Sequence, residues 1–290
     1  NAAHTCGHDA HTAALLGAAK ALIQIRDKFS GTIKLVFQPG EEGLHGAKVL
    51  VAKGVMENPH VDLMVAMHNT PMYKLGQIAC AEGQIMAASD RFTARFIGKS
   101  AHGSRPAEGR NALLALSHAV IGLHEIVSNE LTTKEMAVVN TCVLKCGTAA
   151  NIIPDKATIS GTVRCLDPEV RETLEAAIRR VANAAALLCG CEAEINYIRG
   201  TDAVINDEET VNNIIASTSK IVGSENIVHL KSLLGGEDFS FYRKYVERIA
   251  FYRVGTGTPE NGPVIQLHNA HYDTNDEVIP YCIAAHIQCV

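Results

Sequence analysis

The sequence predicts an α/β fold made of two domains, and two patterns along the chain support this prediction. Strand-like runs alternate with helix-like runs in residues 1–88 and again in 204–290, which is typical of a layered fold with a mostly parallel sheet. Between them, residues 89–203 follow the order β-α-β-β-α-β, the order of a ferredoxin-like sandwich. We therefore predict a first domain formed by 1–88 and 204–290, into which a second domain, 89–203, is inserted.

The predicted elements of the first domain bring polar side chains to one edge of its sheet. Its expected helices cover about 13–26, 46–53 and 208–221, and its expected strands cover 32–37, 61–67 and 249–254. Asp9 or Thr12 is the expected cap of the first helix. The buried strand 32–37 leads through a Pro-Gly turn to Glu41 and Glu42, and the strand 61–67 leads to His68. Ligands bind at the carboxyl ends of the strands in such sheets.

The inserted domain is read in the same way. Its expected strands cover about 92–97, 136–145, 157–164 and 192–198, and its expected helices cover about 111–127 and 168–188. A glycine-rich loop after the first of these strands carries His102. Glycines allow a close approach of backbone and ligand, so this histidine is a candidate site residue.

Composition excludes several classes of protein. Apolar residues make up 47% of the chain, charged residues 20%, and the formal net charge is -5, which is typical of a globular enzyme without the basic surface that nucleic acid requires. The chain contains no run of about 18 apolar residues, the length that is needed to span a membrane. The chain begins inside a motif and ends in an apolar helical pattern, so we expect a fragment truncated at both its N- and C-terminal ends.

Nine cysteines are scattered along the chain, and we interpret them as reduced thiols of a cytoplasmic protein. The pairs Cys142/Cys146 and Cys189/Cys191 have spacings close to those of metal sites, but they lie in apolar segments without a histidine nearby. We therefore expect these four to be buried as small hydrophobic residues.

The stretch His4–Thr12 holds the densest metal-binding chemistry of the chain. If it is extended, Cys6 and His8 leave the backbone on the same face and can reach one ion. Adjacent carboxylates on a tight turn point apart, so Glu42 can bind metal while Glu41 takes a proton from metal-activated water. His68 follows a predicted strand and His268 a glycine-rich loop. Each residue alone has a plainer interpretation, such as a solvated turn or a surface histidine.

Seven motifs in order along the chain resemble one family. They are His4–Thr12, Val36–Gly43, Ala101–Ser104, Asn151–Pro154, Gly161–Arg164, Glu237–Phe239 and His268-Asn269. Together they are similar to the metal-dependent N-acyl-amino-acid amidohydrolases. This is the hippurate hydrolase and auxin-conjugate hydrolase group of the zinc-peptidase superfamily, which also holds carboxypeptidases and aminoacylases.

The resemblance implies a zinc-peptidase-like catalytic domain with a complete set of site residues. The implied ligands of two divalent metal ions (zinc, manganese, cobalt or nickel) are Cys6, His8, Glu42, His68 and His268. Glu41 matches the general base. In the wider superfamily the residue that matches His102 reaches across a dimer to the scissile carbonyl, and those that match Asn151 and Arg164 hold the carboxylate of the product amino acid. The inserted domain would then form a homodimer or a lid.

The residues that depart from the family's pattern leave the acyl group unassigned. The family commonly has an aromatic residue before the proline that follows its metal histidine, whereas this chain has Asn69-Thr70-Pro71 and no tryptophan. The leading hypothesis is hydrolysis of the amide bond of a small-molecule N-acyl amino acid. A dipeptidase or carboxypeptidase of the same superfamily is the closest alternative, and a non-catalytic metal-binding dimerisation module is an alternative from another class.

Overall fold

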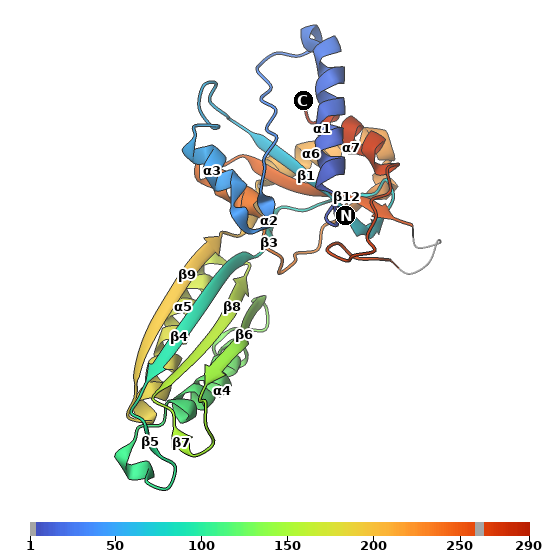
Figure 1. The fold of residues 1–290 in the computed structure, drawn as a ribbon. Coiled ribbons are helices and arrows are strands. Elements are labelled where there is room, and N and C mark those ends of the chain that lie inside the picture. The colour runs from blue at the N-terminus through green and yellow to red at the C-terminus, as the bar shows by residue number, and fades with distance from the viewer. Residues whose placement is uncertain (1–3, 259–263) are drawn as a thin grey trace. The chain divides into compact units, whose positions relative to one another are not determined.

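The computed structural model describes residues 4–258 and 264–290 (Figure 1). The chain forms two compact units. Unit 1 comprises the residues up to Ile85, Ile205–Lys231 and those from Asp238 on, and unit 2 comprises Met86–Val204 and Ser232–Glu237. The predicted boundaries after residues 88 and 203 refer to domains that fold independently. The two units are defined only by how the folded chain packs, so these domain boundaries stay predictions.

The sheet of unit 1 is mixed, with the strand order β1-β12-β2-β11. Its strands are β1 (Met64–Lys74), β12 (Ile249–Gly257), β2 (Ile78–Cys80) and β11 (Ile227–His229). The pairs β1·β12 and β11·β2 are parallel, while β12 and β2 run antiparallel with Arg253 opposite Ala79. The sheet is therefore parallel in most of its pairs, as the alternation of helices and strands predicts, but not in all.

Four longer helices belong to unit 1: α1 (His8–Gln24), α3 (Gly46–Ala52), α6 (Glu208–Val222) and α7 (Val278–Gln288). Ala14, Ile214 and Val278 from three of these helices share one core with Tyr252 of β12. Helices α1 and α7 pack closely, because a Cβ atom at Gly17 would lie 2.5 Å from the Cδ1 atom of Ile283. Burial of each such Ile or Val contributes about 1.5–3 kcal/mol, and this packing fixes the start of α1.

The described residues also form several short elements. They are α2 (Glu41–Leu44), the two-stranded sheet of β3 (Gly83–Met86) and β10 (Val204–Asn206), and the 3-10 helices η1 (Arg26–Lys28), η2 (Pro106–Glu108), η3 (Ser224–Asn226) and η4 (Asp238–Lys244).

The strand predicted at 32–37 is wrong. This segment is extended but belongs to no sheet of the described residues, and Leu35 and Phe37 are 38% and 48% exposed. Lys34 holds it instead, since its Nζ atom donates to the carbonyl oxygens of Val55, Glu57 and Pro59, each at 2.7 Å. A run rich in β-branched residues favours a strand only where a neighbouring strand completes its hydrogen bonds.

Unit 2 is an antiparallel sheet with the strand order β6-β8-β4-β9. The strands are β4 (Ala88–Ile97), β6 (Ala137–Cys146), β8 (Lys156–Cys165) and β9 (Glu192–Thr201), and the helices are α4 (Ala112–Glu130) and α5 (Pro168–Leu188). Both helices lie on the same face of this sheet (Figure 1). Phe92, Phe96 and Leu123 are fully buried between the two layers, so this unit has a core of its own.

One expectation about unit 2 needs correction. Cys142 is exposed rather than buried, because it lies on β6, an edge strand of the sheet, and Cys146 and Cys189 are only half-buried. Within the described residues, α4 is long and apolar enough to cross a membrane by length and composition alone, but polar residues interrupt it, so it holds no run of 18 apolar residues. Its buried face includes Ala115, Ala119 and Leu123, which pack in the core of unit 2.

A buried ion pair fastens one end of unit 2. Asp90 accepts hydrogen bonds from Nε and Nη2 of Arg171 at 2.8 and 2.6 Å, from the Tyr197 hydroxyl at 2.8 Å and from the Gly200 backbone nitrogen at 3.0 Å. Asp90 is 1% and Arg171 7% exposed. Such a pair is costly to break, because the charge left behind remains buried.

We predict that Asp90→Ala lowers the free energy of unfolding by about 3–5 kcal/mol, since it removes two hydrogen bonds to the buried Arg171 and leaves the half-exposed Asp202 as its remaining carboxylate. Urea denaturation followed by circular dichroism measures this loss. The matched control is Glu194→Ala, which removes a pair with Arg95 whose side chains are each 61% exposed and should cost less than about 1 kcal/mol. Equal losses in the two variants would contradict the prediction.

Candidate metal centre

The segment around Gly7 is a tight turn and not the extended strand considered from the sequence. Gly7 has φ +80° and is the N-cap residue of α1, so His8 is the first residue of that helix and neither Asp9 nor Thr12 caps it. A Cβ atom at position 7 would lie 2.2 Å from the amide nitrogen of Asn69. Glycine is therefore required both by the left-handed backbone and by the lack of space.

The turn brings the first two expected ligands to a third. Potential ligand atoms of Cys6, His8 and His68 all lie within 4.8 Å of one another, and the Cys6 Sγ atom is 3.4 Å from Nε2 of His68. The Nδ1 atom of His68 lies 2.5 Å from the carbonyl oxygen of Asn69. Donation from Nδ1 to that carbonyl leaves Nε2 with a free lone pair that faces the thiol, as a metal ligand requires.

A second group of potential ligands shares the same cysteine. Atoms of Cys6, Glu42 and His268 also lie within 4.8 Å of one another, and Nε2 of His268 is 3.4 Å from Oε1 of Glu42. The backbone nitrogen of His268 donates to the carbonyl oxygen of Thr5 at 2.7 Å, which fastens this loop beside the Gly7 turn. One thiol between two sets of imidazole and carboxylate donors fits two neighbouring transition-metal ions.

Glu41 stands beside this cluster with its carboxyl half-buried. Its carboxylate lies within 4.8 Å of potential ligand atoms of His8 and Glu42, and within the same distance of one of Asp238. Glu41 begins α2, a single distorted turn between Gly40 at φ +68° and Gly43 at φ +77°. Burial, together with the negative charges of Asp238 and Glu42, raises the pKa of Glu41 to about 7. A carboxyl with such a pKa can accept and return a proton near neutral pH.

Burial also sets the charge of the histidines. It lowers the pKa of His8, lowers that of His68 well below its usual value, and lowers that of His11 to about 4. Neutral imidazoles are the form that binds metal. The His11 ring lies 4.5 Å from the His68 ring, centroid to centroid, although the sequence leaves its role undecided.

Asp238 and Gln38 are site residues that the sequence reasoning did not single out. Asp238 accepts a hydrogen bond from the Gln38 side chain at 2.6 Å and another from the backbone nitrogen of Ala47 at 3.0 Å. Both residues lie in motifs quoted for the family resemblance, and this was the available signal. Their bonds tie η4 to the turn that carries Glu41 and Glu42.

Two of the three candidate substrate residues in unit 2 lie together. The strand pair of β5 (Ala101–His102) and β7 (Ile152–Ile153) joins their loops, and Gly103 donates to the carbonyl oxygen of Asn151 at 2.8 Å. The exposed His102 ring has its Nδ1 atom 2.8 Å from the Ser104 hydroxyl. This bond holds the ring with Nε2 directed away from Ser104.

Arg164 lies at the other end of β8. This strand runs from Lys156, just after the β7 segment, to Cys165, and eight residues of strand span roughly 27 Å. One copy of unit 2 therefore does not bring Arg164 to His102 and Asn151. Burial lowers the pKa of Arg164, and within the described part of the chain its guanidinium forms no ion pair.

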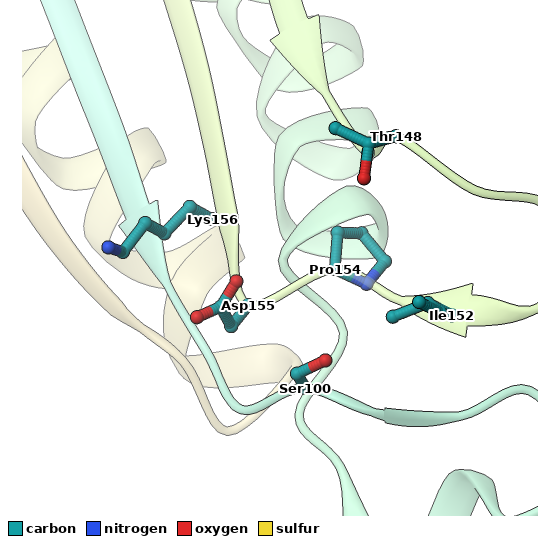
Figure 2. A pocket seen from close by; sticks show the side chains of 7 residues that line it. Ser100, Thr148, Ile152, Pro154, Asp155 and Lys156 are labelled. Atoms are coloured by element: carbon teal, nitrogen blue, oxygen red, sulfur yellow. The ribbon is translucent and has the colours of Figure 1, made fainter.

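A hollow of about 300 Å³ lies where β7 leads into β8. Figure 2 shows Ser100, Thr148 and Lys156 among the side chains around it. Its lining includes no cysteine, histidine or glutamate, so we do not assign the metal chemistry to this hollow.

The α/β unit with the mixed sheet carries two groups of potential metal ligands that share one thiol, an arrangement suited to a protein that binds two metal ions. Comparison with known proteins agrees, because residues 1–290 match the model of peptidase family M20/M25/M40. The chain belongs to this family.

Three relatives illustrate the match. The chain is 35% identical over 287 residues to IAA-amino acid hydrolase ILR1-like 4 of Arabidopsis thaliana, which covers 98% of the chain and 64% of the plant protein. It is 34% identical over 280 residues to hippurate hydrolase of Campylobacter jejuni, and this match covers 96% of the chain and 71% of the bacterial protein. The crystal structure of the Bacillus subtilis YXEP protein, a dinuclear metal binding peptidase, has a TM-score of 0.82 and 30% identity over 99% of this chain and 72% of that one. The chain thus spans about two thirds of the length of these relatives.

Proposed function

We propose that the protein hydrolyses the amide bond of N-acyl amino acids, with Glu41 as the general base. One observation carries this proposal: a half-buried carboxyl that stands beside two potential ligand groups that share Cys6. Metal-assisted hydrolysis needs such a division between ligands and a free base. The names of the relatives, which include hippurate hydrolase and N-acetylcysteine deacetylase, point to the same substrate class.

The proposed roles in unit 1 follow from the kinds of ligand atom that it brings together. The ligands of a pair of zinc, manganese, cobalt or nickel ions would be Cys6, His8, Glu42, His68 and His268. When bound, these ions supply an activated water and polarise the carbonyl group. Glu41 takes the proton from the attacking water and returns it to the nitrogen of the leaving amino acid, which balances the reaction.

Unit 2 supplies the proposed substrate contacts. His102 donates a hydrogen bond to the carbonyl oxygen as negative charge develops there, an effect of about 10²–10³ in rate. Asn151 and Arg164 hold the carboxylate of the amino acid, and the planar guanidinium of Arg164 suits a carboxylate well.

The surroundings of Arg164 leave its guanidinium available for a carboxylate. A Cβ atom at Gly236 would lie 3.0 Å from Nη1 of Arg164 and 3.1 Å from Oγ1 of Thr201, so both groups pack against this glycine. Thr201 is 7% exposed, and its hydroxyl has no hydrogen-bond partner among the described residues.

A homodimer through unit 2 completes the proposal. His102 and Asn151 lie at one end of β8 and Arg164 at the other, so two copies are needed if all three serve one substrate. The edge strand β6 exposes Val143 and Leu144, at 44% and 54%, and α4 beside it exposes Ile121 at 61%. An open edge with apolar side chains favours pairing with a second strand.

We further propose a cytoplasmic location, with no nucleic acid or membrane as partner. All nine cysteines are free in the structure, which suits a reducing compartment.

A carboxypeptidase or dipeptidase activity is the second candidate. Thermostable carboxypeptidase 1 of Saccharolobus solfataricus is 31% identical to the chain over 98% of its length, and the same donor set would serve a peptide bond. Assays of N-acetyl, N-benzoyl and dipeptide substrates side by side separate the two. We expect kcat/KM to be highest for an N-acyl amino acid, and a preference for dipeptides would favour the second candidate.

For Glu41→Gln we expect turnover of N-acyl amino acids to fall by about 10²–10⁴, because the amide cannot take the proton of water. Metal content and melting temperature should stay as in the parent protein. The control is Glu57→Gln at an exposed position of unit 1, which should leave turnover unchanged. Unchanged turnover in Glu41→Gln would remove Glu41 from its assigned role.

A charge at the β6 edge should separate the proposed dimer. We expect Leu144→Lys to sediment as a monomer in analytical ultracentrifugation and to lose most of its activity, because a charged lysine on an exposed edge strand disfavours pairing with a second strand. The control is Leu187→Lys on α5, where the native side chain is 80% exposed; this variant should stay dimeric. A parent protein that sediments as a monomer yet is fully active would refute the dimer.

A further inference from the structure

Asn69, the residue after His68 in β1, holds a buried polar network beside the candidate metal centre. Its side chain is 0% exposed. The Nε2 atom of His11 lies 2.7 Å from its side-chain oxygen and 3.0 Å from its backbone nitrogen. Its side-chain nitrogen donates to the hydroxyl of Tyr272 at 2.9 Å. A buried amide is stable only when its bonds are made, so these contacts determine where it sits.

The same amide is packed against the turn between Cys6 and His8. The three atoms closest to a Cβ atom built at Gly7 all belong to the Asn69 amide, at 2.2, 2.7 and 2.8 Å. The amide therefore occupies the space that a side chain at position 7 would take. The spacing between the Gly7 turn and β1, and with it the 3.4 Å between Cys6 Sγ and His68 Nε2, depends on the place of this side chain.

Tyr272 connects the network to the last ligand. It lies in the loop that follows His268, is 6% exposed, and donates its backbone nitrogen to the carbonyl oxygen of Asn269 at 2.9 Å. Three segments far apart in the sequence thus meet at one amide: the turn before α1, the middle of β1 and the loop before α7. These segments carry Cys6, His8, His68 and His268.

We infer that Asn69 and Tyr272 are positioning residues, which fix the spacing of the four ligands on these segments through the bonds of one buried amide. The inference rests on the metal centre of the proposed function. Neither side chain is assigned a contact with metal or substrate, so both act through the ligand segments that they join. Outer residues of this kind commonly change metal affinity 10–100-fold when they are altered.

Tyr272→Phe is the sharpest test, because it removes one hydroxyl and keeps the ring that fills the core. The Asn69 amide nitrogen would then retain only the Thr274 hydroxyl, at 3.5 Å. We expect the 290-residue chain with this change to bind Zn²⁺ about 10-fold more weakly in competition with a chelator. Its Co²⁺ form should show a shifted visible absorption spectrum, because the ligand geometry relaxes. Asn69→Ala should have the larger effect on both.

Tyr245→Phe is the matched control, since Tyr245 is 50% exposed and its change should leave affinity and spectrum unaltered. Far-ultraviolet circular dichroism verifies the fold of each variant, and Tyr272→Phe alone decides the question if Asn69→Ala does not fold. Parent-like Zn²⁺ affinity and Co²⁺ spectrum in Tyr272→Phe would overturn the inference and leave the proposed function standing. A parent chain that binds neither ion would overturn both.

Discussion

The left-handed turn at Gly7 is the constraint on which the candidate metal centre depends. It starts α1 at His8 and leaves Cys6 just before the helix, so the two side chains approach one point from a loop and from a helix. No other residue type fits, because the positive φ and the Asn69 amide both exclude a Cβ atom. Helix α1, which follows the turn, packs against α7 at Gly17 and Ile283. This packing fixes the position of the helix and so of the turn before it.

Electrostatics explain why such a cluster calls for cations. Glu41, Glu42 and Asp238 gather negative charge in a partly buried place, and their mutual repulsion adds to the burial that raises the pKa of Glu41 to about 7. The buried histidines are neutral and offer lone pairs instead of compensating charge. Carboxylates, a thiol and neutral imidazoles in one place lose stability without a cation and gain it with one.

Periodicity along the sequence predicts helices better than it predicts sheets. The helix expected at 168–188 is α5 at the same residues, because its apolar spacing and the cap at Asp167 are local. The strand expected at 32–37 fails because its stability depends on a partner that its own residues do not specify. The prediction that Cys142 is buried is wrong for a related reason, since an apolar run on an edge strand leaves some side chains in solvent.

The candidate site likewise has features that the sequence predicts and features that it does not. Residues of the metal-binding type were predictable, since cysteine, histidine and paired carboxylates have few other reasons to recur in such motifs. The turn geometry at Gly7 and the pairing of Gln38 with Asp238 were not, because they depend on contacts between distant parts of the chain: Gly7 with Asn69, and Gln38 with a residue 200 positions away. Asn69 is the clearest case: it was noticed only as a departure from the family's pattern, and its importance lies in what it touches.

If Arg164, His102 and Asn151 serve one substrate, as proposed, the reaction depends on assembly as well as on folding. Strand β8 is paired along nearly its whole length on both sides, to β4 and to β6, so it cannot fold back to bring its two ends together. A substrate held by Arg164 at one end and by His102 and Asn151 at the other needs these ends from different copies. Dissociation would then stop the reaction while every residue of unit 1 stayed in place. Metal binding by a monomer without turnover is the state that this division of residues implies.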